Sequence, residues 1–144
     1  MTGRIVVGVD GSEHAERAVQ WCAAHAAGLD AEVVVVHVVE TPGYGPTMGP
    51  YGAGIPPLTE EEREEIRDLV ARDWCKPLAD AGVAFRVTVM KGRPAPALIE
   101  VARTEGAGLV VTGRRSRGGL AECVLGSTSH QLSHHADCPL VIVP

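Results

Sequence analysis

Residues Thr112 to Ser129, TGRRSRGGLAECVLGSTS, combine small, hydroxylated and cationic side chains at a spacing suited to holding an anion. Three arginines and three glycines fall within 113–119, directly after the apolar run 109–111. Glycines let backbone N–H groups approach and surround an anion. A second small pair, Gly126-Ser127, stands where a helix is expected to begin, and a helix start offers unpaired N–H groups and the positive end of a dipole. The pattern predicts a phosphate-binding loop, with a solvent-exposed turn as the alternative.

The elements that would position this loop alternate between strand and helix. Nearly continuous apolar runs, typical of parallel strands covered on both faces, predict strands at 5–9, 33–39, 84–90, 109–112 and 140–143. Apolar residues at helical spacing predict four helices: one after the N-cap Ser12, one from Thr59 to about Leu78, one from Pro94 and one at 127–135. Pro77 is expected to kink the second helix or to end its regular part. This alternation predicts a Rossmann-like α/β fold, a five-stranded parallel sheet with helices on both faces. The loop then follows the fourth strand, at the sheet edge where ligands bind.

The bulk composition limits the class of protein. A chain of 144 residues with 45% hydrophobic and 22% charged residues fits one globular domain over 1–144. The formal net charge of −5 argues against a general nucleic-acid binder, since phosphate backbones favour excess positive charge. No apolar run approaches the length of a membrane span and the first residues lack a signal-peptide pattern, so we expect a cytoplasmic protein without membrane contact.

One segment does not fit a compact connection. Residues 41–58 hold five glycines and five prolines. A loop of this length and composition is uncommon inside a domain. We expect a mobile linker there, with a lid over a ligand as the alternative.

Three further stretches resemble the universal stress proteins, and with the loop they extend the resemblance over the whole chain. They are IVVGVDGSEHAERAVQWC around the first strand, VVVVHVV in the second, and HHADCPLVIVP at the end. Adenine-nucleotide-binding members of this family carry a glycine, two residues, a glycine, nine residues, then a glycine and a serine or threonine. Here that spacing runs from Gly113 through Ser116 to Gly126-Ser127. The resemblance implies the strand order 3-2-1-4-5, in which the turn after the first strand meets the loop after the fourth.

The resemblance also implies a site for ATP or ADP, alone or with Mg²⁺, at that meeting point. It places Gly8, Val9 and Asp10 beside the nucleoside, Val38 at the adenine, Thr112 and Gly113 at the ribose and phosphates, Gly118 and Gly119 where they keep the loop open, and Gly126, Ser127 and Thr128 at the phosphates. The residues of the loop themselves indicate Arg114, Arg115 and Arg117 as added positive charge. Asp10 is the candidate Mg²⁺ ligand, together with triphosphate oxygens.

Ser116 departs from the family pattern, which has glycine at that position. If the position requires a left-handed backbone, serine costs about 1–2 kcal/mol, and its side chain occupies space that glycine leaves for a phosphate. Alternatively, the serine hydroxyl donates a hydrogen bond to the ligand. The sequence leaves both possibilities open.

Three functions are compatible with these residues. The favoured one is a nucleotide-binding stress or signalling protein whose ligand changes its interactions. The alternatives are a dimeric interaction module without a ligand and a slow ATPase that uses the same pocket. Because the sequence has no GxSxG, HExxH or complete P-loop, we expect no catalytic residue and at most weak ATP hydrolysis. His130 and His134 are four residues apart, but no third metal ligand is evident, so we expect an exposed helix face and no metal site.

The last strand predicts a homodimer. Residues 140–143 are apolar and form an edge in the order 3-2-1-4-5, and no lysine or arginine guards that edge. The resemblance implies the same contact, since many relatives dimerise through this strand. The alternative is a monomer whose edge is covered by a neighbouring loop.

Overall fold

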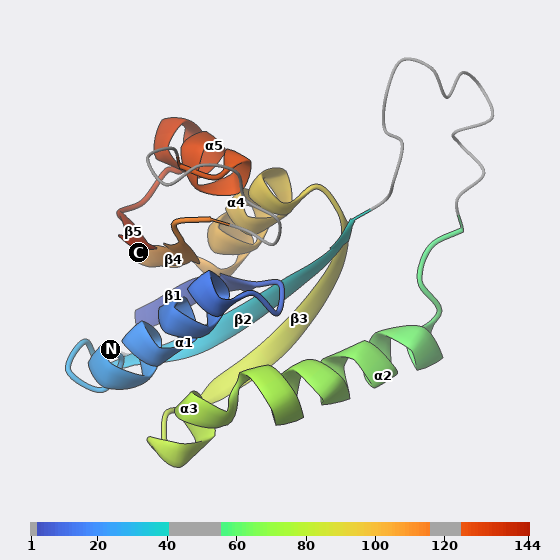
Figure 1. Ribbon diagram of the computed structural model, residues 1–144, viewed down its shortest axis with the longest axis horizontal. Coiled ribbons are helices and arrows are strands. Elements are labelled where there is room, and N and C mark those ends of the chain that lie inside the picture. Colours follow the sequence, from blue (N-terminus) through green and yellow to red (C-terminus); the bar gives the residue numbers. More distant parts are fainter. Residues whose placement is uncertain (1–2, 41–55, 116–124) are drawn as a thin grey trace.

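Five parallel strands form one sheet in the order β3-β2-β1-β4-β5 (Figure 1). The fold is seen in a computed structural model that describes residues 3–40, 56–115 and 125–144. The strands are β1 (Gly3–Val9), β2 (Ala31–Glu40), β3 (Phe85–Gly92), β4 (Leu109–Gly113) and β5 (Leu140–Val143). The predicted parallel sheet and its strand order are confirmed.

Helices cover both faces of this sheet, as predicted. One side carries α1 (Glu13–His25), α2 (Glu60–Leu69) and α3 (Lys76–Asp80), and the other carries α4 (Pro94–Glu105) and α5 (Ser127–His135). In the described part of the chain, no helix combines the length and the apolar character needed to cross a membrane.

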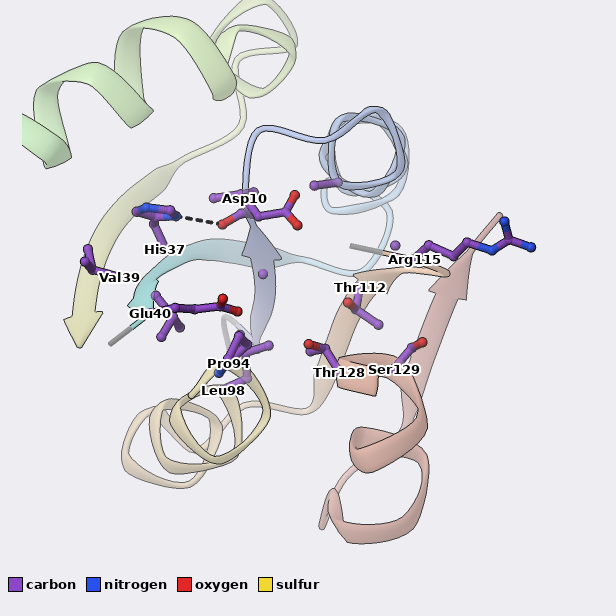
Figure 2. A pocket seen from close by; sticks show the side chains of 15 residues that line it. Asp10, His37, Val39, Glu40, Pro94, Leu98, Thr112, Arg115, Thr128 and Ser129 are labelled. Atoms are coloured by element: carbon purple, nitrogen blue, oxygen red, sulfur yellow. Dashed lines mark hydrogen bonds between the residues drawn. The ribbon is translucent and has the colours of Figure 1, made fainter. Parts of the chain in front are cut away.

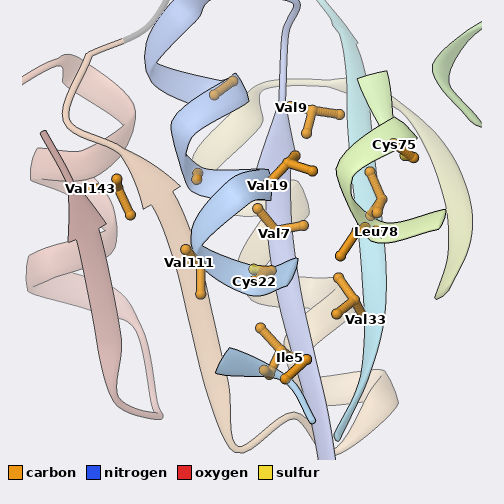
Figure 3. Close-up of a cluster of buried hydrophobic side chains, with 14 of the residues drawn as sticks. Ile5, Val7, Val9, Val19, Cys22, Val33, Cys75, Leu78, Val111 and Val143 are labelled. Carbon is orange, nitrogen blue, oxygen red and sulfur yellow. The ribbon is translucent and has the colours of Figure 1, made fainter. Parts of the chain in front are cut away.

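The two faces of the sheet receive alternate residues of each central strand. In β1, Ile5, Val7 and Val9 belong to the apolar cluster under α1 and α3 (Figure 3), whereas Val6 belongs to the cluster under α4. Because side chains alternate along a strand, a run that is apolar throughout fills both clusters. This arrangement explains why the central strands read as continuous valine-rich runs, and it holds their carboxyl ends in fixed positions.

The helix predicted from Thr59 to about Leu78 begins as expected. The Thr59 hydroxyl accepts a hydrogen bond from the Glu62 N–H at 3.1 Å, and the Glu62 carboxylate accepts one from the Thr59 N–H at 2.8 Å. This reciprocal pair satisfies two N–H groups that the start of a helix leaves unpaired.

The same helix does not continue to Leu78. After α2 the chain widens into the π-helical segment η2 (Val70–Trp74), where the Cys75 N–H donates to the carbonyl of Val70 at 3.1 Å. A new helix, α3, follows with Pro77 in its first turn. The expectation that Pro77 itself kinks or ends one long helix is corrected: proline has no N–H to donate, and it is tolerated where a helix starts.

An ion-pair network ties the amino ends of the strands together, opposite the predicted site. Arg4 Nε donates to Glu32 Oε1 at 2.7 Å, and Arg4 Nη1 lies 3.4 Å from Glu105 Oε2. Arg86 Nη2 donates to the same Glu105 carboxylate. These interactions hold the pKa of Glu105 below its ordinary value, the hydrogen bond from Arg86 contributing most.

Candidate functional site

A cavity of about 350 Å³ lies at the carboxyl ends of the strands (Figure 2). Its walls come from the ends of β1, β2 and β4 and from the first turns of α1, α4 and α5. This is where the strand order reverses direction between β1 and β4, the usual ligand position in such sheets. The volume is within the range of small-molecule sites, about 300–1,000 Å³.

The cavity gathers most of the predicted site residues that the structure describes. Those that line it are Gly8, Val9, Asp10, Val38, Thr112, Gly113, Arg115 and Thr128. Ser116, Arg117, Gly118 and Gly119 lie outside the described residues, as do 41–55 of the glycine- and proline-rich loop. The roles of all these residues toward a ligand stay predictions.

Arg114, Gly126 and Ser127 are not among the lining residues, and two of them close the backbone around the site instead. The Arg114 N–H donates to the carbonyl of Val143 at 2.7 Å, and the Arg114 carbonyl accepts from the Gly126 N–H at 2.9 Å. Ser127 borders a neighbouring depression that also includes Thr128. These three residues thus take a supporting position beside the cavity wall, and their contacts with a phosphate stay predictions.

Ser129 lines the cavity and was not predicted. Its side chain is 1% exposed, and its Oγ lies 2.9 Å from the carbonyl oxygen of Arg114 and 3.1 Å from that of Gly126. The hydroxyl therefore joins the exit of β4 to the start of α5. Its only signal in the sequence was its place in the first turn of the predicted helix.

The start of α5 brings backbone donors to this region. Gly126 is the N-cap residue, and the first backbone bond of the helix runs from the His130 N–H to its carbonyl at 2.9 Å. The N–H groups of 127–129 accordingly have no partner within the helix. Because Thr128 and Ser129 line the cavity, these donors and the positive end of the helix dipole lie beside it.

The turn after β1 forms the opposite wall. Asp10 Oδ1 accepts a hydrogen bond from the Ser12 N–H at 2.9 Å, and Ser12 Oγ accepts from the Ala15 N–H at 3.2 Å. Gly11, between them, has a φ of 82°, a value that side-chain-bearing residues rarely adopt. Figure 2 shows the Asp10 carboxylate directed across the end of β1 toward the β4 side.

The end of β2 contributes residues that the sequence indicated only in part. His37, Val39 and Glu40 line the cavity beside Val38, and His37 Nδ1 donates to the carbonyl of Val9 at 2.9 Å. Since a carbonyl only accepts, this contact assigns the ring proton to Nδ1. Apolar periodicity predicts a buried strand but does not show how far β2 extends past β1, so His37, Val39 and Glu40 were not predicted to line the site.

The remaining unpredicted wall comes from helix starts. Pro94 and Leu98 of α4 lie below Glu40 in Figure 2, and the N–H of Ala15 of α1 hydrogen-bonds to Ser12 of the turn after β1. These apolar residues carry no chemical signal in a sequence, because the same types fill any core. Leu98 shares an apolar cluster with Val38, and with Pro94 these residues give the cavity an apolar end between β2 and α4.

Two lining glycines are required by packing. A Cβ on Gly113 would lie 2.7–2.8 Å from the backbone carbon and oxygen and the Cβ of His14. A Cβ on Gly8 would lie 2.9 Å from a terminal methyl carbon of Leu98. The first contact involves a helix backbone and the second a flexible side chain, so Gly113 is the less replaceable of the two.

The charges of the lining residues are mixed. Asp10 and Glu40 carry carboxylates, and Arg115 carries the one guanidinium among the described lining residues. In Figure 2 the Arg115 side chain points away from Asp10 and Thr112. In the part of the chain that is described, its Nε and Nη2 are buried without a hydrogen-bond partner.

No metal centre of protein ligands is found within the described ranges, where no three histidine, cysteine, aspartate or glutamate side chains come together. His130 and His134 pack edge to face with ring centroids 4.7 Å apart, on the exposed side of α5. A magnesium ion at Asp10 would therefore need oxygen ligands from a bound phosphate.

Comparison with known families and sequences gives one consistent result. The profile of the universal stress protein family matches residues 1–144. The universal stress protein YxiE of Bacillus subtilis is 30% identical over 155 residues, covering 99% of this chain and 99% of that protein. A universal stress protein of Mycolicibacterium smegmatis is 32% identical over 140 residues, 96% of this chain but 47% of that relative. The chain thus spans about half the length of the second relative.

Solved structures share the same fold. The universal stress protein UspA from Lactobacillus plantarum superposes with a TM-score of 0.76 at 20% identity, covering 99% of this chain and 97% of that chain. A universal stress protein in complex with cAMP has a TM-score of 0.69 at 23% identity, with coverage of 99% and 96%. One from Archaeoglobus fulgidus in complex with dAMP has a TM-score of 0.67 at 22% identity, with coverage of 99% and 98%.

Proposed function

The chain belongs to the universal stress protein family, and from that premise we propose that it binds an adenine nucleotide, ATP or ADP, in the cavity at the carboxyl ends of the strands. One observation carries the proposal: the cavity has a donor-rich end at α5 and an apolar end between β2 and α4. A nucleotide has the same polarity, with phosphates at one end and a flat base at the other. The neighbours in complex with cAMP and dAMP support an adenine ligand.

The geometry favours one direction for the ligand. The N–H groups of 127–129 and the hydroxyl of Thr128 face the phosphates. The base then lies between Val38 and Leu98, away from the helix dipole.

The backbone at the end of β2 supports recognition of the base. β1 ends at Val9, which pairs with His37, while β2 continues to Glu40 with β3 as its neighbour. Within the described strands, the β1 side of β2 beyond His37 thus has no strand partner. Backbone groups there are free to hydrogen-bond the edge of an adenine, the role predicted for Val38.

Asp10 lies on the ribose side of this arrangement. With a nucleotide bound, Asp10 and phosphate oxygens would together hold Mg²⁺, which neutralises phosphate charge. We further propose that the bound state alters the interactions of the protein in stress response or signalling, as the family membership suggests.

Calorimetric titration with ATP, ADP and cyclic AMP tests the binding proposal. Thr128→Val removes a hydroxyl at the phosphate end and should weaken ATP binding about tenfold, because hydrogen bonds to charged groups contribute more than neutral ones. Ser133→Ala removes a hydroxyl from the exposed far end of the same helix and should change nothing. Absence of heat and of any thermal shift with all three nucleotides would favour the interaction module. Phosphate release in the ATP samples tests the slow-ATPase alternative.

We also propose a homodimer formed through β5. Among the described strands β5 pairs with β4 alone, so its outer edge presents unpaired backbone groups. The carbonyls of Pro139 and Val143 accept hydrogen bonds from Val110 and Arg114, so the outward donors of β5 belong to Leu140 and Ile142. Ile142→Pro removes one of these outward donors and should give monomers or insoluble protein. Sedimentation of the unmodified chain as a 15.1 kDa monomer at micromolar concentration would exclude the dimer.

A further inference from the structure

A second cavity, of about 270 Å³, lies on the other side of the turn after β1. We call it the Trp74 cavity. The first turns of α1 form one wall, and η2 with α3 forms the other. Its apolar floor includes Val9 and Val19, which Figure 3 shows between α1 and the segment carrying Cys75. Val9 and Ala15 contribute to both cavities, but the strand-end polar residues contribute only to the first.

The indole of Trp74 is held in place as a wall of this cavity. A Cβ on Gly11 would lie 2.7 Å from the ring, so the ring packs directly on the glycine backbone. The ring also meets His37 edge to face, with centroids 5.1 Å apart. The π-helical turn of η2 sets the direction in which the side chain leaves its helix. Trp74 is thus half-buried with a fixed orientation, rather than free on the surface.

The polar rim of the Trp74 cavity is predominantly acidic. Glu16, Asp73 and Asp80 provide three carboxylates against the single ammonium of Lys76. Lys76 Nζ already lies 3.3 Å from Asp80 Oδ2, and Asp73 pairs with Arg72 at 3.0 Å. Glu16 has no ion-pair partner within the described residues. Its carboxylate is therefore the one available to a ligand.

We propose that the Trp74 cavity binds a small organic cation: an ammonium group attached to an apolar or aromatic body. The body packs on Trp74 and the valine floor, since burial of apolar surface is favourable. The ammonium lies at the rim, where Glu16 attracts it and the indole face adds a cation–π contribution. An anion of the same shape meets the carboxylates and is rejected. This site does not depend on the nucleotide proposal, because it shares none of the polar residues assigned to that ligand.

Three probes of similar shape distinguish the head group from the body: 2-phenylethylammonium, 2-phenylethanol and 3-phenylpropionate. The chain has two tryptophans, and Trp21→Phe leaves Trp74 as the only indole reporter. In that variant the ammonium probe should give a saturable change in fluorescence, with an affinity about tenfold or more above that of the carboxylate probe. No saturable change, or equal affinities for the three probes, would overturn the proposal.

A matched pair of charge variants locates the contact. Glu16→Gln should weaken binding of the ammonium probe about two- to fivefold, as expected for an exposed charge pair. Glu13→Gln removes the same charge one turn earlier on α1, from a residue that does not line the cavity, and should leave the affinity unchanged. Equal weakening by both variants would mean that the general acidity of the surface, and not this cavity, attracts the cation. Circular dichroism of both variants checks that the fold is retained.

Discussion

Replacement of Gly113 by alanine should destabilise the protein through packing, whether or not a ligand binds. The new Cβ would lie 2.7 Å from the carbonyl carbon of His14 and 2.8 Å from its Cβ and oxygen. Ordinary carbon contacts lie near about 3.5 Å, so β4 and α1 would have to separate by about 0.7–0.8 Å. Overpacking of this kind costs about 1–3 kcal/mol of unfolding free energy. In a domain of this size, that corresponds to a fall in Tm of about 3–10 °C.

Gly108→Ala is the matched control, because nothing lies within 4 Å of the Cβ it would introduce at the other end of β4. Neither glycine has a φ in the left-handed region, so backbone strain does not distinguish the two variants. Guanidinium unfolding and calorimetry of the ligand-free variants measure the difference. We expect Gly108→Ala to remain within about 0.5 kcal/mol of the parent. If Gly113→Ala were as stable as Gly108→Ala, the close packing of α1 on Gly113 would be refuted. The presence of glycine at position 113 of the loop motif would then have to reflect the ligand alone.

Three further changes test other parts of the structure. Burial raises the pKa of Cys22 to about 12 and that of Cys75 to about 11, so both thiols should resist alkylation near pH 8 until the protein unfolds, as mass spectrometry can show. Because these pKa values exceed the ordinary 9.0, the contribution of the two buried thiols to the stability of the fold is present below pH 9 and is lost as the pH rises toward 12. The pKa of Glu105 is lowered, so its contribution to the stability of the fold is lost as the pH falls through that pKa. Glu105→Gln should therefore lose less stability than the parent between about pH 5 and pH 3. An unchanged acid profile would contradict the pairing with Arg86. Ser116→Gly should tighten ATP binding up to about tenfold if the serine crowds the loop, and should weaken it if the hydroxyl contacts a phosphate. An unchanged Kd would mean that position 116 does not affect the ligand.

The sheet could be predicted from the sequence because its strands are covered on both faces. Valine-rich runs such as 33–36 are typical of strands buried on both sides, and β5 was predicted with the bounds that the structure gives. The strand order came from the resemblance, since apolar periodicity carries no information on neighbours. The helix after Thr59 was predicted correctly at its start, where capping is a local interaction, and wrongly in its continuity. The π-helical turn accompanies the packing of Trp74 and Cys75 on the core, which no local pattern shows.

The residues of the candidate site were likewise predicted where they carry a local signal and missed where their position depends on packing. Residues that carry a motif, such as Asp10 and Thr112, were predicted and do line the cavity. Ser129 and Leu98 were missed, because a helix start and an apolar helix face look alike wherever they occur in a sequence. Glu40 was missed because its place depends on β2 extending beyond β1, which is a property of the pairing between the two strands.

The π-helical turn η2 has a consequence for insertions and deletions. A π turn holds one residue more than an α turn, as the contact from Cys75 back to Val70 indicates. Removal of one residue, such as Ala71, would let the segment wind as a regular α-helix into Cys75. The side chains before the deletion would then turn by about 100° relative to those after it. Either the face of α2 or the indole of Trp74 would leave its present partner. Relatives that lack this residue are accordingly expected either to repack the face of α2 or to carry a side chain other than tryptophan at position 74, and to keep glycine at position 11 because of its φ of 82°.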